Sequence, residues 1–533
     1  MIQLSFMYQK AGWLSSTILL AVCAFIGAQS GTMLSEAMTK LPGNDVFQSR
    51  AEIISLSRFY FGRSWLYGLS VFLLIFSLLS VNIASIIISA QQMDATLVAI
   101  YGTCAVIFYP TPGAQCTRNP AEPAQPFGEH DIVLSLGFVV VLLVAIPMGY
   151  FNLDDNIIVQ QIATMMLVAI LCIWFAFFAE VGIHTGTLPV WGDDQTSVVG
   201  TLLFNFTFVT SIPSWVNEKK PGVSVSRSIN GTTALGTLIF LLLGVLGAMT
   251  FSFDDKSSDL LKAIESITTD TTLTKMAHVT VYMFPVVAFL SSIPVFAIII
   301  RYNLLQNRIC GKAVANFIAV VLPWLIALPF YTGTGLSLVI TWSSLVANGL
   351  INYVVPMWFF YLSRDERANR DRALRFIDIL REQIAGEARD RLRAALRAAR
   401  KQPGYDASRD DDNVRIPPHE PTASEVQLAL IEASVAEQKQ LHFSIQRSSM
   451  ASINDVGADA PPLHDGECHH AGDPEQSVIY GVPEAKELFF AWPWKNVKVG
   501  RVAALCMIVL TLILNVVAIG VAIYLCAADG KCN

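Results

Sequence analysis

Runs of about twenty apolar residues recur along the chain, and polar or charged segments separate them. A bilayer core of about 30 Å requires a helix of about this length to cross it. The pattern predicts ten spans, at residues 13–37, 65–89, 132–150, 157–179, 197–216, 230–252, 276–300, 313–330, 336–361 and 499–526. The stretch 95–112 is also apolar, but Pro110 and Pro112 favour a loop or re-entrant segment there.

The span at 197–216 is interrupted, because Pro213 lies inside it. Four polar side chains precede this proline, those of Asn205, Thr207, Thr210 and Ser211. Proline removes one helical hydrogen bond, and in hydrocarbon the freed backbone groups must find another partner or line a cavity. Interrupted spans of this kind bind substrate in secondary transporters. The alternative interpretation is a simple kink whose backbone groups are satisfied by Ser and Thr hydroxyls.

The composition agrees with a polytopic membrane protein rather than a soluble globule, since 53% of the 533 residues are hydrophobic and 15% are charged. Basic loops at 40–63, 219–227 and 301–312 alternate with acidic loops at 193–194 and 254–270. Because basic loops stay on the cytoplasmic side, ten spans place both termini outside. The membrane is expected to be the plasma membrane or a vacuolar or lysosomal membrane.

A charged segment separates the last span from the others and divides the chain into three parts. These are a transmembrane core at 1–362, a cytoplasmic insertion at 363–497, and a last helix with a short outer tail at 498–533. The insertion begins with a basic amphipathic helix at 364–401, which is expected either to lie on the anionic leaflet or to be solvated by ion pairs. Its apolar positions are Leu374, Ile377, Leu380, Ile384, Ala388 and Leu392. Residues 402–497 are expected to be largely disordered and to offer a site for a cytoplasmic protein partner.

The predicted spans contain almost no ionisable residues, which intramembrane chemistry requires on the interior side of a bundle. An enzyme is therefore not expected, and neither are a metal site, a cofactor or a nucleic-acid partner. The nine cysteines form no CxxC pair. Cys104 and Cys116 share one loop, and they could form a disulfide if the loop faces an oxidising compartment.

Several short motifs follow one another in a characteristic order. They are Ala11-Gly12-Trp13-Leu14, Phe59-Tyr60-Phe61-Gly62-Arg63, Ile212-Pro213, Asn217-Glu218-Lys219-Lys220, Ser291-Ser292-Ile293-Pro294-Val295 and Asn352-Tyr353-Val354-Val355-Pro356. In order, spacing and topology they resemble the amino acid/auxin permease family, and in particular its sodium-coupled neutral amino acid transporters. The resemblance covers most of residues 4–362, with 499–526 as the family's eleventh span.

This resemblance implies an all-α, inverted-repeat transporter fold and a set of site residues. Substrate contacts are expected at the broken sixth span and at three positions in neighbouring spans. These are Asn205, Phe206, Thr207 and Phe208, with Asn82, Ser85 and Asn348 as further lining residues. Ser291 and Ser292 fall where sodium-coupled members place a hydroxyl ligand, although helix–helix packing also favours small hydroxylated residues there.

Compared with this family, the chain shows two differences. The family's first span should be broken at the substrate site, and this chain begins after that break, so the first span is expected to be mostly missing. An incomplete gene product and an inactive protein are both compatible with that. The long insertion before the last span is the second difference, and it suggests regulation.

Two functions follow from these observations. The first is secondary active transport of amino acids, neutral ones in particular, by alternating access coupled to Na⁺ or H⁺. The second is a non-transporting amino acid sensor or scaffold of the same fold that signals through the cytoplasmic insertion. Loss of uptake on changing Asn205 and Thr207 would distinguish the first from the second.

Overall fold

The computed structural model divides the chain into two compact units, Met1–Arg381 with Glu487–Asn533, and Glu382–Lys486. The structure describes residues 3–44, 47, 49–109, 113–117, 132–151, 153, 156–192, 195–220, 222–253, 260–332, 343, 347–379 and 496–529, all of which belong to the first unit. The predictions for residues 380–495 and for most of residues 336–346 lie outside the described residues.

Within the described residues, seven helices are long and apolar enough to cross a membrane. They are α2 (Trp13–Met38), α4 (Trp65–Tyr101), α6 (Ile157–Val181), α9 (Val225–Thr250), Thr272–Gln306, Lys312–Phe330 and Val497–Gly520 within α19 (Val497–Asp529). Thr272–Gln306 comprises α11 (Thr272–Pro285), η3 (Val286–Leu290) and α12 (Ser292–Gln306). Lys312–Phe330 comprises α13 (Lys312–Asn316), η4 (Phe317–Val321), α14 (Leu322–Ala327) and η5 (Leu328–Phe330). These helices are those of a mostly helical, polytopic membrane protein.

The remaining predicted spans correspond to shorter or interrupted helices. These are α5 (Leu136–Gly149), the pair α7 (Thr196–Asn205) and α8 (Ile212–Glu218) joined by η2 (Val209–Ser211), and η7 (Leu350–Val354) followed by α16 (Val355–Ser363). Short helices connect the spans: α1 (Leu4–Ala11), α3 (Ile53–Phe61), η1 (Thr185–Thr187) and α10 (Leu260–Glu265). An additional helix covers residues 366–379.

Over residues 95–109 the chain is not the predicted loop or re-entrant segment, and Pro110 and Pro112 lie outside the described residues. The helix α4 continues to Tyr101 and ends at Gly102, whose left-handed φ of 77° suits a glycine at a helix C-terminus. The chain then forms β1 (Cys104–Tyr109), which pairs antiparallel with β2 (Gly113–Thr117) and β3 (Ile132–Ser135) in the order β2-β1-β3. Cys116 pairs with Ala105 rather than with Cys104, and both cysteines are free. The Cys104–Cys116 disulfide is therefore not formed.

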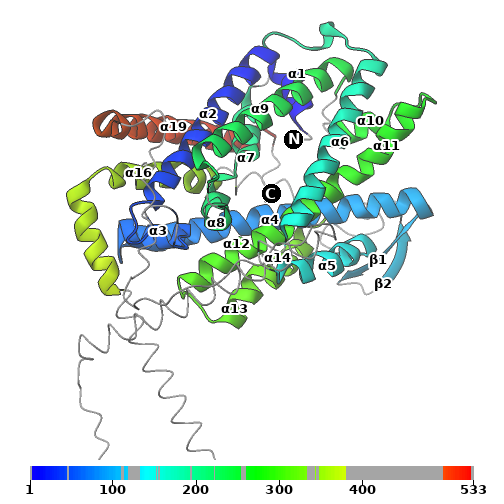
Figure 1. Cartoon of the computed structure of the whole chain (residues 1–533). Helices are drawn as coiled ribbons and strands as arrows, with labels where there is room; N and C mark the ends of the chain where they lie inside the picture. Colours follow the sequence, from blue (N-terminus) through cyan, green and yellow to red (C-terminus); the bar gives the residue numbers. More distant parts are fainter. Residues whose placement is uncertain are drawn as a thin grey trace, which may run out of the picture. The chain divides into compact units, whose positions relative to one another are not determined.

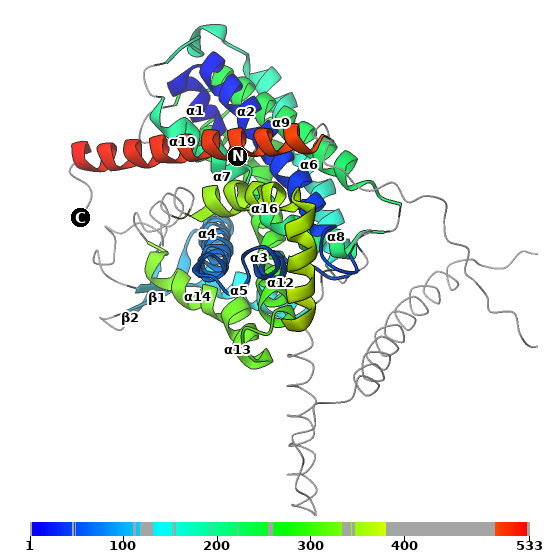
Figure 2. The same cartoon turned by 90° about the vertical axis from the view of Figure 1, so that its left-hand side faces the viewer.

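Two sets of packed helices organise the described part of the chain (Figure 1). The helix α2 contacts α7, α9 and α16, whereas α4 contacts α5, α12 and α14. Figure 2 shows α4 nearly end-on, with α12, α5 and α14 beside it. The short helix α3 contacts α4, α12 and α16. It therefore touches both the set around α4 and, through α16, the set around α2.

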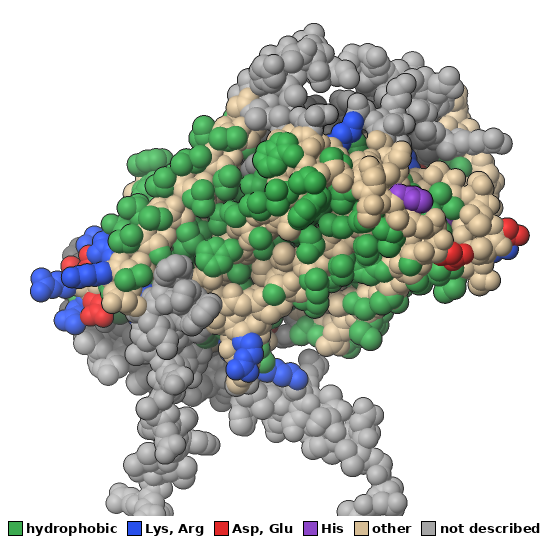
Figure 3. All heavy atoms as spheres, turned by 90° about the horizontal axis from the view of Figure 1, so that it is seen from above, with side chains coloured by type: hydrophobic (Ala, Val, Ile, Leu, Met, Phe, Trp, Pro, Cys, Tyr) green, Lys and Arg blue, Asp and Glu red, His purple; other side chains and the backbone are tan. Residues whose placement is uncertain are grey.

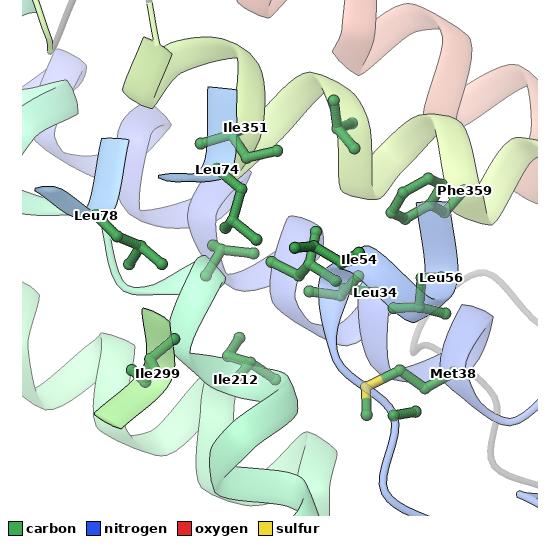
Figure 4. Packing of buried hydrophobic residues seen from close by; sticks show 14 of the residues in the cluster. Leu34, Met38, Ile54, Leu56, Leu74, Leu78, Ile212, Ile299, Ile351 and Phe359 are labelled. Atoms are coloured by element: carbon green, nitrogen blue, oxygen red, sulfur yellow. The ribbon is translucent and has the colours of Figure 1, made fainter. Parts of the chain in front are cut away.

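One apolar core joins these two sets (Figure 4). Its fully buried members include Leu34 of α2, Ile54 of α3 and Leu74 of α4. Ile212 at the start of α8 and Ile299 of α12 belong to the same cluster. Because lipid tails are as apolar as this core, close packing rather than transfer from water holds the half of the interrupted span that follows the break.

The outer surface of the spans is apolar. Large side chains such as Met165, Leu235 and Val516 are 72%, 60% and 66% exposed. On the face drawn in Figure 3, hydrophobic side chains cover the middle, and the charged side chains gather toward the ends. A surface of this kind requires a hydrocarbon environment, because large apolar patches are rare on soluble proteins.

The helix at 366–379 packs against α3 through one face. The ring of Phe376 lies 5.7 Å from that of Phe59, and the Arg372 guanidinium lies 5.8 Å from the Tyr60 ring. Leu374, on the predicted apolar face, is 61% exposed. An exposed Leu374 is compatible with contact to a leaflet and with a solvated helix, so the two interpretations of this segment both stay open.

Candidate functional site

The interrupted span has a break of three residues. The helix α7 ends at Asn205, residues 206–208 form a turn, and η2 leads into α8. Pro213 occupies the first turn of α8, where its missing N–H costs little. In a continuous helix its ring would clash with the carbonyl group one turn back, at Val209, and that is where the chain adopts the tighter η2 turn. The break predicted from Pro213 thus lies just upstream of the proline.

Two neighbouring residues of η7 satisfy backbone groups on both sides of the break. The Tyr353 hydroxyl lies 3.2 Å from the carbonyl oxygen of Leu203 and 3.1 Å from that of Phe206. The backbone N–H of Thr210 donates to Asn352 Oδ1 at 3.1 Å. Both side chains are fully buried. The π-helical turn of η7 therefore supplies a donor to the end of α7 and an acceptor to the start of η2.

A line of polar side chains connects this turn to two further helices. Ser30 of α2 donates to the Asn352 carbonyl oxygen at 2.6 Å, and Asn352 Nδ2 donates to the Asn348 carbonyl oxygen at 3.1 Å. Ser77 of α4 donates to Asn348 Oδ1. The predicted lining residue Asn348 is thus brought to the break through Asn352. Chains of buried hydrogen bonds of this kind are expensive to leave incomplete, so they hold neighbouring helices in register.

Asn82 and Ser85 lie on one face of α4 together with Ser89, and all three are buried. Ser85 donates to the Val81 carbonyl oxygen at 2.9 Å. Asn82 Oδ1, Ser89 Oγ and Asn348 Nδ2 have no hydrogen-bond partner among the described residues. Buried polar atoms without partners are uncommon in folded proteins, and the three atoms come from α4 and from the segment that precedes η7.

The four residues predicted at the broken span differ in their surroundings. Phe206 is buried, and its ring packs at 5.6 Å against that of Phe240 on α9. Thr207 and Phe208 are half-buried, and Asn205 Nδ2 donates to the Thr201 carbonyl oxygen at 2.7 Å. Asn205 therefore ends α7 and the other three residues form the turn, with Phe206 directed into the core.

Ser291 and Ser292 lie at a second irregularity, where the π-helical η3 meets α12. The Ser291 hydroxyl donates to the Val287 carbonyl oxygen at 2.7 Å, and Gln160 of α6 donates to the Ser291 carbonyl oxygen at 2.6 Å. The hydroxyl of Ser291 is therefore engaged within its own helix. Whether these two serines bind an ion stays a prediction.

Four residues at the break were not predicted as site residues, namely Ser30, Ser77, Asn352 and Tyr353. Asn348 and Asn352 are four residues apart in an apolar run. This spacing could have indicated a polar face on that helix. For Ser30 and Ser77 the sequence carried no signal, because isolated serines are common in membrane helices.

The comparisons with known proteins bear on this arrangement. A family model described as transmembrane amino acid transporter protein matches residues 1–331, which is more than half of the chain. The chain belongs to this family. No curated protein matches the chain closely enough to be counted as a relative. The family match includes α1 through η5 and ends before Asn348, so the polar residues of η7 lie beyond it.

Family membership identifies the chain as an integral, multi-pass membrane protein and supports amino acid transport across a membrane. It agrees with the resemblance drawn from the short motifs. The broken span, α4, η3 and α12 all fall inside the matched residues, so the candidate site is built mainly from the family's own segments.

Proposed function

We propose that the protein is a secondary active transporter that moves neutral amino acids by alternating access, coupled to Na⁺ or H⁺. The observation that carries the proposal is the break at residues 206–208. Side chains of a different helix form hydrogen bonds with the backbone on both sides of this break. The two helix ends that flank a break at membrane depth carry opposite partial charges, which suit the carboxylate and ammonium groups of an amino acid.

The charge distribution favours an uncharged side chain on the solute. The buried ionisable side chains of the described spans are engaged away from the break. Glu36 pairs with Arg364 at 3.0 Å, and Asp94 accepts from the Gly137 N–H at 2.7 Å. Arg301 donates to the Tyr150 carbonyl oxygen at 3.1 Å. A cationic or anionic side chain at the break would therefore be buried without a counter-charge, which is costly.

The packing supports alternating access as the mechanism. The segments α7 and α8 pack on α2, whereas α12 packs on α4 and α5. Polar side chains, rather than the apolar core alone, join the two sets at the break. We expect α7, α8 and their neighbours to rock against α4 and α12, with residues 206–208 as the hinge and as the solute contact.

Uptake into proteoliposomes tests this proposal. The full chain carrying both Asn205→Ala and Thr207→Ala should insert normally and lose uptake of a labelled neutral amino acid by about tenfold or more. The matched control is Thr237→Ala on α9, whose hydroxyl donates to the Thr233 carbonyl oxygen at 2.7 Å and should leave uptake unchanged. Unchanged uptake in the double variant would remove the proposed site.

The same vesicles identify the driving ion. Replacing external Na⁺ by a large organic cation should abolish uptake if Na⁺ drives it, whereas dissipating a pH gradient should abolish uptake if H⁺ does. Saturable binding of the amino acid to the purified chain, without uptake under either gradient, would instead favour the sensor. In that case the contact of the helix at 366–379 with α3 would be the route from the core to the insertion.

A further inference from the structure

Glu52 is a buried carboxylate that the proposed transport site does not use. It lies in the connection between α2 and α3, outside the spanning segments, and is fully buried. It precedes the first residue of α3, but its side chain makes no capping bond to that helix. Its carboxylate is directed instead toward α8 and α12.

Three neutral side chains donate to this carboxylate. Ser214 Oγ lies 2.9 Å from Oε2 and 3.0 Å from Oε1. Asn217 Nδ2 donates to Oε1 at 3.0 Å, and Asn303 Nδ2 donates to Oε2 at 3.2 Å. Ser214 and Asn217 belong to α8 and Asn303 to α12, so Glu52 bridges helices that belong to the two different packed sets.

The two amides also bind the backbone on either side of Glu52. Asn217 Oδ1 accepts from the Ala51 N–H at 3.1 Å, and Asn303 Oδ1 accepts from the Ile54 N–H at 3.3 Å. The segment 51–54 is therefore inserted between α8 and α12 and hydrogen-bonded to both. Separation of α8 from α12 requires this segment to leave at least one of them.

No basic group pairs with Glu52 among the described residues. The charged and titratable groups on the elements packed around it are Arg50, Arg58, Tyr60, Glu218, Arg301 and Tyr302. Arg50 pairs with Glu218 at 3.2 Å, and Arg301 donates to backbone carbonyl groups between α5 and α6. Glu218 is the charged group that acts on Glu52, and as a like charge it disfavours ionisation. Burial, reinforced by Glu218, raises the pKa of Glu52 to about 8.

The site can accommodate a proton by reversing one hydrogen bond. A protonated Oε2 requires an acceptor, and Ser214 Oγ at 2.9 Å can accept because a serine hydroxyl serves as donor or acceptor. Asn217 and Asn303 still donate to the remaining lone pairs. The three neutral donors favour the ionised carboxylate, but burial of a charge without a counter-charge outweighs them.

We propose that Glu52 is a proton-binding site that holds α8 against α12 when protonated and releases its proton when the two helices separate. The loops at this end of the bundle are the basic ones, so the proton is exchanged with the cytoplasm. Once hydrated, the carboxyl returns toward its ordinary pKa and ionises at neutral pH. A rise in cytoplasmic pH therefore favours opening. The consequence for transport rests on the proposed function, whereas proton binding itself does not.

Two measurements on the full chain in lipid nanodiscs test the proposal. Infrared titration should show a protonated carboxyl that disappears with a midpoint near the raised pKa and is missing in Glu52→Gln. Hydrogen exchange of peptides covering α8, corrected for intrinsic rates, should show protection that falls by up to about tenfold per pH unit up to about pH 8 and then levels off. The matched control is Glu180→Gln, an exposed acid at the end of α6, which should behave like the wild type.

Three outcomes overturn the proposal: no titrating carboxyl, pH-independent protection in the wild type, or the same pH dependence in Glu52→Gln. If Glu52→Gln fails to fold, the pH dependence of protection at α8 in the wild type still decides the question. Because neither measurement involves uptake, the two proposals can fail separately. If the chain titrates as expected but transports no amino acid, the proposed proton site is supported and the proposed transport function is refuted.

Discussion

The hydroxyl of Tyr353 offers the sharpest test of how the break is held. It is fully buried, and it is within hydrogen-bond distance of the carbonyl oxygens of Leu203 and Phe206, at 3.2 Å and 3.1 Å. Tyr353→Phe removes this one oxygen and keeps the ring, so it opens no sizeable cavity. The variant therefore isolates the hydrogen bond from the packing.

The expected cost follows from the loss of a buried donor. Leaving a buried polar group unsatisfied costs about 1–3 kcal/mol, which corresponds to about a 5- to 150-fold change in the unfolding equilibrium. Hydrogen bonds between membrane helices contribute about 1–2 kcal/mol at most, because the unfolded chain in the membrane also finds partners, so we expect the lower half of that range. Because the lost bond orders the turn at 206–208, uptake should fall together with stability.

Equilibrium unfolding of the full chain in mixed lipid–detergent micelles measures this cost. The control is Tyr282→Phe, which removes an exposed hydrogen bond of 2.7 Å to Glu265 and should cost less than about 0.5 kcal/mol. Equal stability of the two variants would refute the conclusion that Tyr353 satisfies the broken helix. A destabilised Tyr353→Phe with full uptake would separate the stability of the turn from its function.

Two further predictions concern buried charges. Because the folded state raises the pKa of Glu52 from 4.5 to about 8, its stabilising contribution is complete below about pH 4.5 and is lost as pH rises toward about pH 8. Glu52→Gln should flatten this dependence in unfolding curves collected across that range. Glu36→Gln leaves the 3%-exposed Arg364 side chain without its counter-charge and should cost about 3–5 kcal/mol in the same unfolding assay. Lys275→Ala, which breaks an exposed pair with Asp270, should cost less than about 1 kcal/mol, and equal costs would contradict the argument.

The long spans could be predicted from the sequence because apolar length is a local property. The predicted spans 13–37 and 157–179 agree with α2 and α6 to within two residues. The prediction was wrong at 95–109, where the end of α4 and a β-strand replace the expected loop. The apolar pattern there is equally compatible with a helix, a strand or a loop, and pairing with β2 and β3 decides the outcome.

The candidate site could be predicted only in part. Pro213 and the polar residues before it indicated the broken span, and the break lies within that segment. The hydropathy pattern could not indicate which side chains bond to the break, since Tyr353 is 150 residues from Leu203 in sequence. Glu52 was overlooked for the same reason, because its three donors lie between 162 and 251 residues away.

By itself, the sequence determined that the chain spans a membrane many times, where the spans lie and which of them is interrupted. These properties depend on hydropathy and on proline, both of which act within one helical segment. The tertiary structure decided which side chains satisfy the interruption and that Glu52 is sealed between α8 and α12. Hydrogen-bond partners and burial depend on which distant segments pack together, and no single segment carries that information.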